Sequence, residues 1–257
     1  MKKAAISVVV IAKNEEKRLA ECLKSVEFAA EIVVLDDMST DRTVEVAKSF
    51  GAKVFQRAMD NEGRHRNYAI SCATQDWVLT LDADECVTPE LAQEISEVCG
   101  KTDDPNVGYD MPMKQFIGSE WIRGAGYYPA RRTKMFRRGK FSYKEEEVHP
   151  PCVYQGTVGL FKGDLLHFTS VDFADWIRKF NSQTSLEAKK WVRDARPMGP
   201  WRAFRKACSR FLKYYFQKDG IRHGFTGFLM CYFHFSYQII TFAKYRELKR
   251  AQESASK

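Results

Sequence analysis

The sequence lacks the phosphate-binding motifs of several common nucleotide-dependent enzymes. No Gly-x-Gly-x-x-Gly follows the first apolar segment, which argues against a dinucleotide-binding Rossmann domain. No Gly-x-x-x-x-Gly-Lys-Ser/Thr is present, which argues against a P-loop kinase or ATPase. A cleft that holds a nucleoside diphosphate without such a loop needs a metal ion to offset the phosphate charge.

Paired cysteines and repeats are also missing, and we expect no signal peptide. The 7 cysteines form no Cys-x-x-Cys and no paired metal spacing, which indicates reduced thiols in a cytosolic protein. The basic start at residues 1–5 leads into a short apolar run without a small-residue cleavage site, so we expect a first strand and not a signal peptide. No internal repeat, low-complexity segment or long linker divides the chain.

Charge is distributed unevenly along the chain. The 257 residues, 44% hydrophobic and 29% charged, have an ordinary composition for a soluble protein and can bury a substantial core. The formal net charge is +8, but residues 176–250 alone contain 17 Lys and Arg against 4 Asp and Glu. The basic character therefore belongs to the C-terminal part, and the rest of the chain is net acidic.

Strand and helix patterns alternate in the first hundred residues. The strands are predicted at 6–12, 31–35, 52–55 and 77–81, and the helices between them at 15–26, 42–50 and 63–74. This alternation predicts βαβ units and a parallel sheet. A helix at 89–98 precedes a mixed, partly antiparallel region with strands near 107–116, 134–137 and 153–160, and the chain is helical from residue 171 onward.

Acidic and polar clusters follow three of the predicted strands, at residues 13–16, 36–41 and 82–85. Parallel strands place these clusters along one edge of the sheet, where open α/β sheets bind ligands. Carboxylates next to a buried strand are costly to fold unless they meet a cation. Asp82 and Asp84 therefore predict a Mg²⁺ or Mn²⁺ site that carries a diphosphate. The alternative is a solvated turn ahead of the helix that Thr88 caps.

Four segments in this order resemble the inverting glycosyltransferases of family 2, which have a GT-A fold. The segments are residues 7–16, 33–41, 64–67 and 81–85, and a looser match at 148–150, 156–160, 164–168 and 179–181 is similar to the branch with bacterial lipopolysaccharide core β-1,4-glucosyltransferases. The resemblance implies an α/β, Rossmann-like nucleotide-sugar-binding domain with a mixed central sheet and a helical C-terminal extension. We expect the GT-A domain at residues 1–170, with a nucleotide-binding half (1–100) and an acceptor half (101–170), and a basic, membrane-associating region at 171–257.

The resemblance also implies a nucleoside pocket. Ile11, Ala12 and Glu15 would line it, and Asp37 would accept the uracil N3 proton, because a carboxylate pairs well with a ring N–H. Asp36 is expected instead to orient the loop from within.

The same resemblance implies how the phosphates are held. Arg66, with Arg64, would approach the pyrophosphate or Asp37, although an exposed helix face is the alternative for both arginines. Asp82 and Ala83 would face the ribose or the donor sugar, with Asp82 next to the metal. Asp84 would coordinate the metal, which offsets the charge that develops on the departing nucleoside diphosphate.

An inverting transfer also needs a base that takes a proton from the acceptor hydroxyl. The first candidate is Glu147 and the second is His149, with a charged loop that takes no part in the chemistry as the alternative. Pro150 stands where many members of the branch carry an acid, so the assignment stays open. His167 would either complete the metal shell or be a buried core residue.

The C-terminal part has the pattern of a membrane-associated surface. Residues 200–218 mix basic and aromatic side chains at helical spacing, as in helices that lie at a lipid interface. Residues 224–243 contain no Lys, Arg, Asp or Glu, but their polarity favours an interfacial or re-entrant pair of helices over a span. The segment from Lys244 to Arg250 would then snorkel or face lipid phosphates. The alternative is a helical appendage on the catalytic domain.

The acidic clusters, the basic C-terminal part and the family resemblance together imply a glycosyltransferase. It would transfer glucose from UDP-glucose to a lipid-linked saccharide acceptor such as the lipopolysaccharide inner core. The protein would be cytoplasmic and peripheral on the inner membrane, with no nucleic-acid partner. A nucleotidyltransferase of similar fold, or a non-catalytic membrane- or polyanion-binding module, are the alternatives.

Overall fold

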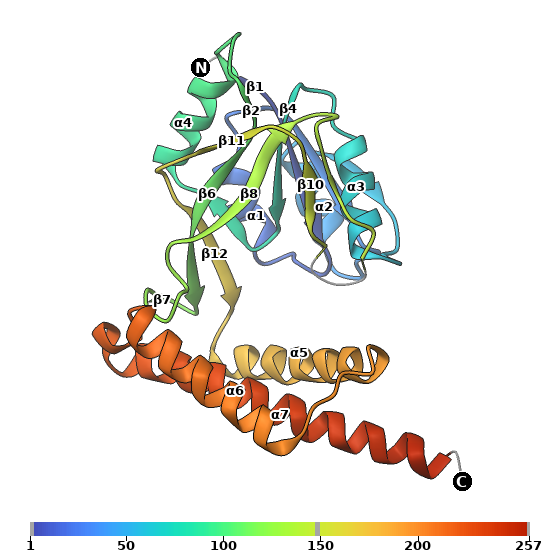
Figure 1. The fold of residues 1–257 in the computed structure, drawn as a ribbon. Helices are drawn as coiled ribbons and strands as arrows, with labels where there is room; N and C mark the ends of the chain where they lie inside the picture. The colour runs from blue at the N-terminus through green and yellow to red at the C-terminus, as the bar shows by residue number, and fades with distance from the viewer. Residues whose placement is uncertain (1–2, 147–149, 256–257) are drawn as a thin grey trace. The chain divides into compact units, whose positions relative to one another are not determined.

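The computed structural model describes residues 3–146 and 150–255. The chain forms two compact units (Figure 1). The first runs to Met113 and resumes over Ala130–His167. The second contains Lys114–Pro129 and the chain from Phe168 onward.

Four parallel strands form the first half of the sheet in the order β3-β2-β1-β4, so β1 is central. The side chains of Val8 and Val10 on β1 are fully buried, as expected for a strand covered on both faces. The predicted strands and their parallel pairing are therefore confirmed. Their bounds are β1 (Ala4–Ala12), β2 (Ala29–Asp36), β3 (Lys53–Gln56) and β4 (Trp77–Asp82).

Helices connect these strands, and the first of them, α1, begins later than the sequence indicated. The helix expected from residue 15 begins at Leu19; Asn14, before it, has a φ of +54°, and its side-chain oxygen accepts a hydrogen bond from the Thr40 N–H at 2.8 Å. Thr88 does cap a helix, since its hydroxyl accepts the Leu91 N–H at 3.3 Å. The helices are α1 (Leu19–Ser25), α2 (Thr43–Ser49), α3 (Glu62–Ser71) and α4 (Pro89–Cys99).

The second half of the sheet is mixed, as predicted. Strand order continues from β4 through β8, β6 and β12 to β5, and β8 is antiparallel to both β4 and β6. The short strand β5 was not predicted. The strands are β5 (Glu85–Val87), β6 (Asn106–Ile117), β7 (Glu120–Ile122), β8 (Ala130–Arg137), β11 (Thr157–Leu160) and β12 (Leu165–Ser170), with β9 (Phe141–Tyr143) and β10 (Cys152–Tyr154) in a separate two-stranded sheet.

The second unit is mainly helical. Its elements are α5 (Phe173–Arg193), α6 (Pro200–Leu212), a π-helical turn η1 (Lys213–Gln217), a 3₁₀ turn η2 (Gly220–His223) and α7 (Gly224–Ala255). The predicted pair of helices at 224–243 is wrong, because α7 is one helix of 32 residues. None of the described helices has the length and apolar character needed to cross a bilayer.

Lys244 also differs from the prediction that it extends toward lipid. Its ammonium donates to the Asn181 carbonyl at 2.6 Å and to the hydroxyls of Thr184 and Ser185 at 2.8 Å each. Lys244 therefore ties α7 to α5 within the second unit.

A buried carboxylate holds the amino-terminal ends of the parallel strands together. Glu31 on β2 is 7% exposed and accepts hydrogen bonds from the Ser7 hydroxyl on β1, from Lys53 on β3 at 2.7 Å and from the Thr74 N–H at 2.8 Å. Burial raises the pKa of Glu31, but the hydrogen bonds from Lys53, Ser7 and Thr74 outweigh burial and bring it down to about 2. The ionised form of Glu31 therefore stabilises the sheet.

We expect Glu31 to make the stability of the protein sensitive to acid. Its pKa is about 2 in the folded chain against a usual 4.5, so its contribution of about 3 kcal/mol is present above pH 4.5 and disappears as pH falls toward 2. In Glu31→Gln, the free energy of unfolding from urea titrations should be lower at neutral pH and less dependent on pH below 4.5. Glu27→Gln, at an exposed position before β2, is the control. An acid dependence equal to that of the wild type would contradict this role.

Candidate active site

The register of the parallel strands brings three predicted site segments to one edge of the sheet. Ala12 at the end of β1 lies opposite Asp36 of β2, and Ile11 lies opposite Asp82 of β4. Main-chain hydrogen bonds continue the pairing just past the strands, since the Asp37 N–H donates to Ala12 O at 2.8 Å and the Ala83 N–H to Ile11 O at 3.2 Å. The loops after β1, β2 and β4 therefore meet at the carboxyl edge.

A cavity of about 290 Å³ opens between these loops. Its lining includes seven of the residues that the sequence assigned to donor or metal binding, as well as His167, which was one alternative for the metal shell, and two residues without an assigned role, Lys13 and Met59. The lining residues are Ile11, Ala12, Lys13, Glu15, Asp37, Met59, Asp82, Ala83, Asp84 and His167. The nucleoside and metal candidates thus share one cavity within the first unit, whereas Arg64 and Arg66, the candidates for the pyrophosphate, are not among its lining residues.

Asp37 is held as a buried, charged acceptor at one end of the cavity. It is 4% exposed and accepts a hydrogen bond from the Lys13 ammonium at 2.9 Å and from the Met59 N–H at 2.8 Å. Burial raises the pKa of Asp37, but these two donors outweigh burial, so the net pKa lies below its usual value. Its neighbour Asp36 accepts from the Ser39 N–H and from Gln56, each at 3.0 Å, which confirms that Asp36 orients the loop.

Asp82 is compensated by two cations. Arg66 on α3 lies 3.0 Å from one carboxylate oxygen of Asp82, and Lys134 on β8 lies 3.3 Å from the other. Lys134 also contacts Glu85 at 2.8 Å, and Glu85 accepts the Asp82 N–H at 2.9 Å. Burial works against the charged form of Asp82, but Lys134 and Arg66 bring its pKa well below the usual value. Asp82 is therefore a charged group inside an ion-pair network.

Lys134 and Glu85 are the buried members of this network. Glu85 is 1% and Lys134 8% exposed. Burial lowers the pKa of Lys134, but the negative charges of Asp82 and Glu85 outweigh burial. The net pKa lies above its usual value, so the ammonium stays protonated. The Thr80 hydroxyl on β4 donates to the Lys134 carbonyl at 3.2 Å, which pins β8 against β4 at this level.

Asp84 faces the cavity next to His167. Nε2 of His167 lies 3.5 Å from one carboxylate oxygen of Asp84, and both side chains line the cavity. His167 arrives there because β12 is antiparallel to β5, with His167 opposite Glu85. Burial lowers the pKa of His167, but Asp84 outweighs burial and raises it. His167 is therefore half-buried at the cavity wall, and the alternative of a core histidine does not describe its position.

The side chains of Asp84 and His167 fit a metal ion that takes only some of its ligands from the protein and the others from water and a bound substrate. Within the described residues, no three His, Cys, Asp or Glu side chains cluster to hold a metal on their own. Asp84 supplies a hard carboxylate and His167 an imidazole, and Mg²⁺ or Mn²⁺ takes its remaining ligands from water and substrate phosphates. Because both oxygens of Asp82 already face cations, Asp84 is the better placed of the two aspartates.

Glu15 reaches the cavity while paired with an arginine that the sequence analysis did not single out. Arg18 contacts both carboxylate oxygens of Glu15, at 2.6 and 2.7 Å, and lies 3.7 Å from Asp84. Arg18 therefore brings positive charge next to the proposed diphosphate site.

The two arginines of α3 have different environments. Arg66 is 18% exposed and contacts Glu62 at 2.9 Å as well as Asp82. Arg64 is 49% exposed, pairs with Asp60 at 3.2 Å and does not line the cavity. Their roles toward a donor phosphate stay predictions.

The two candidate bases, Glu147 and His149, lie outside the described residues. The chain just before them packs on the start of α3, where the Gly63 N–H donates to Glu146 O at 3.1 Å. A Cβ at position 63 would stand 1.9 Å from the Lys144 carbonyl oxygen, so only glycine permits this approach. Gly63 thus anchors the segment that leads to Glu147.

Two groups at the site could not have been found from local pattern. Lys134 was recognised as part of a strand, but its pairing with β4 is what brings its ammonium to Asp82. Lys13 belongs to a predicted site cluster, yet its contact with Asp37 depends on the pairing of β1 with β2. The one available signal for Lys134 was a lysine next to the apolar pair Met135 and Phe136.

A mixed α/β sheet with acidic loops around a cavity at the carboxyl edge of its parallel half is the arrangement of a GT-A glycosyltransferase, as the resemblance implied. The model of the family described as "Glycosyl transferase family 2" matches residues 7–156, more than half of the chain. The chain belongs to this family. It is therefore a glycosyltransferase, and the alternatives of a nucleotidyltransferase and a non-catalytic module are disfavoured.

Relatives resemble the chain along nearly its whole length. The lipopolysaccharide core biosynthesis glycosyltransferase LpsC of Rhizobium meliloti is 28% identical over 254 residues, which cover 94% of this chain and 92% of LpsC. An uncharacterized glycosyltransferase of Rickettsia typhi is 28% identical over 256 residues, which cover 95% of this chain and 87% of that protein. Among solved structures, S. aureus TarS 1-349 in complex with UDP is 15% identical, with a TM-score of 0.48 and coverage of 99% of this chain and 92% of that one.

We expect Lys134 to be required for stability. Lys134→Met should lower the free energy of unfolding by about 3 to 5 kcal/mol, because it leaves Asp82 and Glu85 with one cation fewer in a buried site. The double variant Lys134→Met/Glu85→Gln should recover part of the loss, since it also removes the buried acid. Lys140→Met, at an exposed position, is the control. Urea titrations of these proteins and of Glu85→Gln alone measure the differences, and a double variant whose loss equals the sum of the two single losses would rule out the coupling.

Proposed function

We propose that the protein transfers glucose from UDP-glucose, with inversion at the anomeric carbon, to a hydroxyl of a lipid-linked saccharide such as the lipopolysaccharide inner core. The main support is that Asp37 and Asp84 line the same cavity at the end of the parallel strands. A carboxylate for the uracil ring and another for the diphosphate metal fit one nucleotide sugar. The relative LpsC, named for lipopolysaccharide core biosynthesis, supports this class of acceptor.

In the proposed complex, each part of the nucleotide sugar contacts a different group of lining residues. Asp37, ionised and aimed by Lys13, accepts the uracil N3–H, while Ile11 and Ala12 line the nucleoside pocket with Glu15. Asp82, held by Arg66 and Lys134, accepts hydrogen bonds from the ribose or the donor sugar, next to Ala83. Arg18 lies near the diphosphate end, beside Asp84.

Transfer is a single displacement at the anomeric carbon. The acceptor oxygen bonds to this carbon from the face opposite the diphosphate, the bond to the UDP oxygen breaks, and UDP leaves with the electron pair. Glu147, or His149 in second place, takes the proton of the acceptor hydroxyl. Asp84, with Asp82 and His167 beside it, would hold a Mg²⁺ or Mn²⁺ ion, whose positive charge would stabilise the departing diphosphate.

The C-terminal region, residues 171–257, is proposed as the part that contacts the membrane, so that the enzyme is cytoplasmic and peripheral on the inner membrane. Support comes from exposed apolar side chains on α6, η1 and the start of α7, which alternate with basic ones. The apolar residues are Trp201, Phe204, Leu212, Phe216 and Phe225, and the exposed basic ones include Arg205, Lys213, Lys218 and Arg222. Such a surface would bring the enzyme to a lipid-linked acceptor.

Asp84→Asn tests the proposed metal role. We expect the gain in UDP affinity on adding Mn²⁺ to disappear, and glucose transfer to fall by a factor on the order of 100 or more, because the neutral amide is a weaker metal ligand than the carboxylate. Calorimetric titration of UDP with and without Mn²⁺ measures the first effect. Asp76→Asn, whose side chain is 90% exposed in the parent protein, is the matched control. A metal-dependent gain equal to that of the wild type would reject Asp84 as the ligand.

Glu147→Gln tests the proposed base. Transfer to a truncated lipopolysaccharide acceptor should fall by about 10² to 10⁴-fold, since a positioned base contributes that much, while UDP affinity stays the same. Glu145→Gln, two residues earlier and exposed, is the control. If His149→Gln loses transfer and Glu147→Gln does not, the second candidate replaces the first. Unchanged transfer in both variants would place the base elsewhere.

A further inference from the structure

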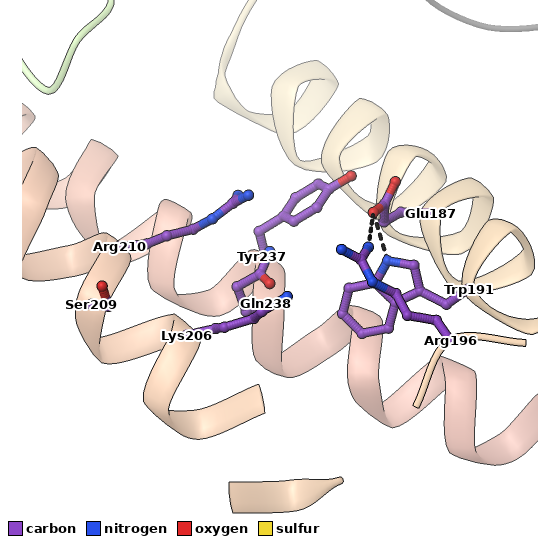
Figure 2. A pocket seen from close by; sticks show the side chains of 8 residues that line it. All are labelled: Glu187, Trp191, Arg196, Lys206, Ser209, Arg210, Tyr237 and Gln238. Carbon is purple, nitrogen blue, oxygen red and sulfur yellow. Dashed lines mark hydrogen bonds and ion pairs between the residues drawn. The ribbon is translucent and has the colours of Figure 1, made fainter. Parts of the chain in front are cut away.

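A second cavity lies wholly within the helical unit. Its volume is about 380 Å³, and its walls come from α5, α6, α7 and the segment between α5 and α6 (Figure 2). The lining residues are Glu187, Trp191, Arg196, Lys206, Ser209, Arg210, Tyr237 and Gln238. None of them lines the cavity at the carboxyl edge of the sheet.

The lining carries more positive than negative charge. Arg196, Lys206 and Arg210 face the cavity with one carboxylate, Glu187. That carboxylate already accepts the Trp191 indole N–H at 2.6 Å and lies 3.8 Å from Arg196, as the dashed lines in Figure 2 show. Lys206 and Arg210 form no ion pair with any described side chain. Glu187 attracts Lys206 only from beyond ion-pair distance, so these two cations have no direct ion-pair partner among the described side chains.

Mutual repulsion acts on Lys206. Partial burial lowers its pKa, and the nearby Arg196, Arg202 and Arg210 lower it further. An anion between these side chains would relieve the repulsion. The cations therefore favour a negatively charged ligand.

Neutral polar groups complete the wall. Gln238 on α7 is 3% exposed with its side chain at the cavity, and the Ser209 hydroxyl lies on α6 beside it. In Figure 2, the side chains of Arg210 and Lys206 extend from α6 toward Tyr237 and Gln238. Several donors around a small volume suit a tetrahedral oxyanion, and guanidinium groups bind phosphate through paired N–H donors.

We propose that this pocket binds a phosphate group, carried by a membrane lipid or a lipid-linked saccharide. The lipid as carrier follows from α6 itself, which exposes Trp201 (73%) and Phe204 (46%) on the helix that supplies Lys206 and Arg210. Aromatic rings of this kind lie at the level of lipid head groups. The site goes beyond the proposed transfer reaction, because it requires neither the donor nor catalysis.

Binding of the full-length protein to two probes tests the site. The probes are inorganic phosphate, titrated by calorimetry in the presence of saturating UDP, and phosphatidylcholine vesicles that contain phosphatidic acid, in co-sedimentation. The test variant is Lys206→Gln/Arg210→Gln. The control is Lys189→Gln/Lys190→Gln, which removes the same charge from exposed positions of α5 that neither line the cavity nor belong to the apolar and basic surface of α6, η1 and the start of α7. Melting temperature and UDP affinity, measured for every variant, report on the fold and on the donor site separately.

We expect the test variant to lose about tenfold in affinity for at least one probe, and the control less than about twofold. Loss with vesicles alone identifies a lipid-borne phosphate, and loss with inorganic phosphate identifies the phosphate group whatever its carrier. Equal losses in the two double variants would overturn the proposal, because diffuse surface charge would then account for binding. An absence of binding to both probes by the wild type would also overturn it. Neither result depends on whether UDP binds.

Discussion

Asp82 and Glu85, at the end of β4, lie against Lys134 and Arg66, and the geometry of the cavity at the carboxyl edge of the sheet depends on this arrangement. Neighbouring carboxylates in a poorly solvated site repel each other, and an uncompensated pair would protonate or distort the loop. The buried ammonium of Lys134 contacts both acids, at 3.3 and 2.8 Å, and Arg66 contacts Asp82 from α3. These contacts join β4, β8 and α3, so the position of Asp82 is set by three elements at once.

The ion pairs of Asp82 with Lys134 and Arg66 give Asp82 and Asp84 different surroundings. Asp82 is surrounded by permanent cations and is suited to accept hydrogen bonds from hydroxyl groups. Asp84 lies beside His167 and Arg18 at longer distances, 3.5 and 3.7 Å, and keeps its carboxylate toward the cavity. In the proposed reaction, the first therefore positions the sugar nucleotide and the second holds the metal on the diphosphate.

Cations in the helical unit have two distinct uses. Lys244 donates hydrogen bonds to Asn181, Thr184 and Ser185, and these bonds join α7 to α5. Lys206 and Arg210 instead face a cavity whose single acid is engaged by Trp191 and Arg196. The basic residues of the C-terminal part therefore fall into two groups in the structure. Some, such as Lys244, stabilise the fold, and others, such as Lys206 and Arg210, line a cavity where they can contact a ligand.

The sequence by itself determined the parallel half of the sheet and the meeting of Asp37 with Asp84. Continuous apolar runs such as Val8 to Val10 require burial on both faces, and parallel strands end at the same edge, so the loops had to converge. Only the tertiary structure decided that Lys134 and His167 join them, and that 224–255 forms one helix. Lys134 lies 52 residues from Asp82, and His167 reaches Asp84 through the antiparallel pairing of β12 with β5. Pairing between strands so distant depends on the packing of the whole sheet, which leaves no local pattern in the chain.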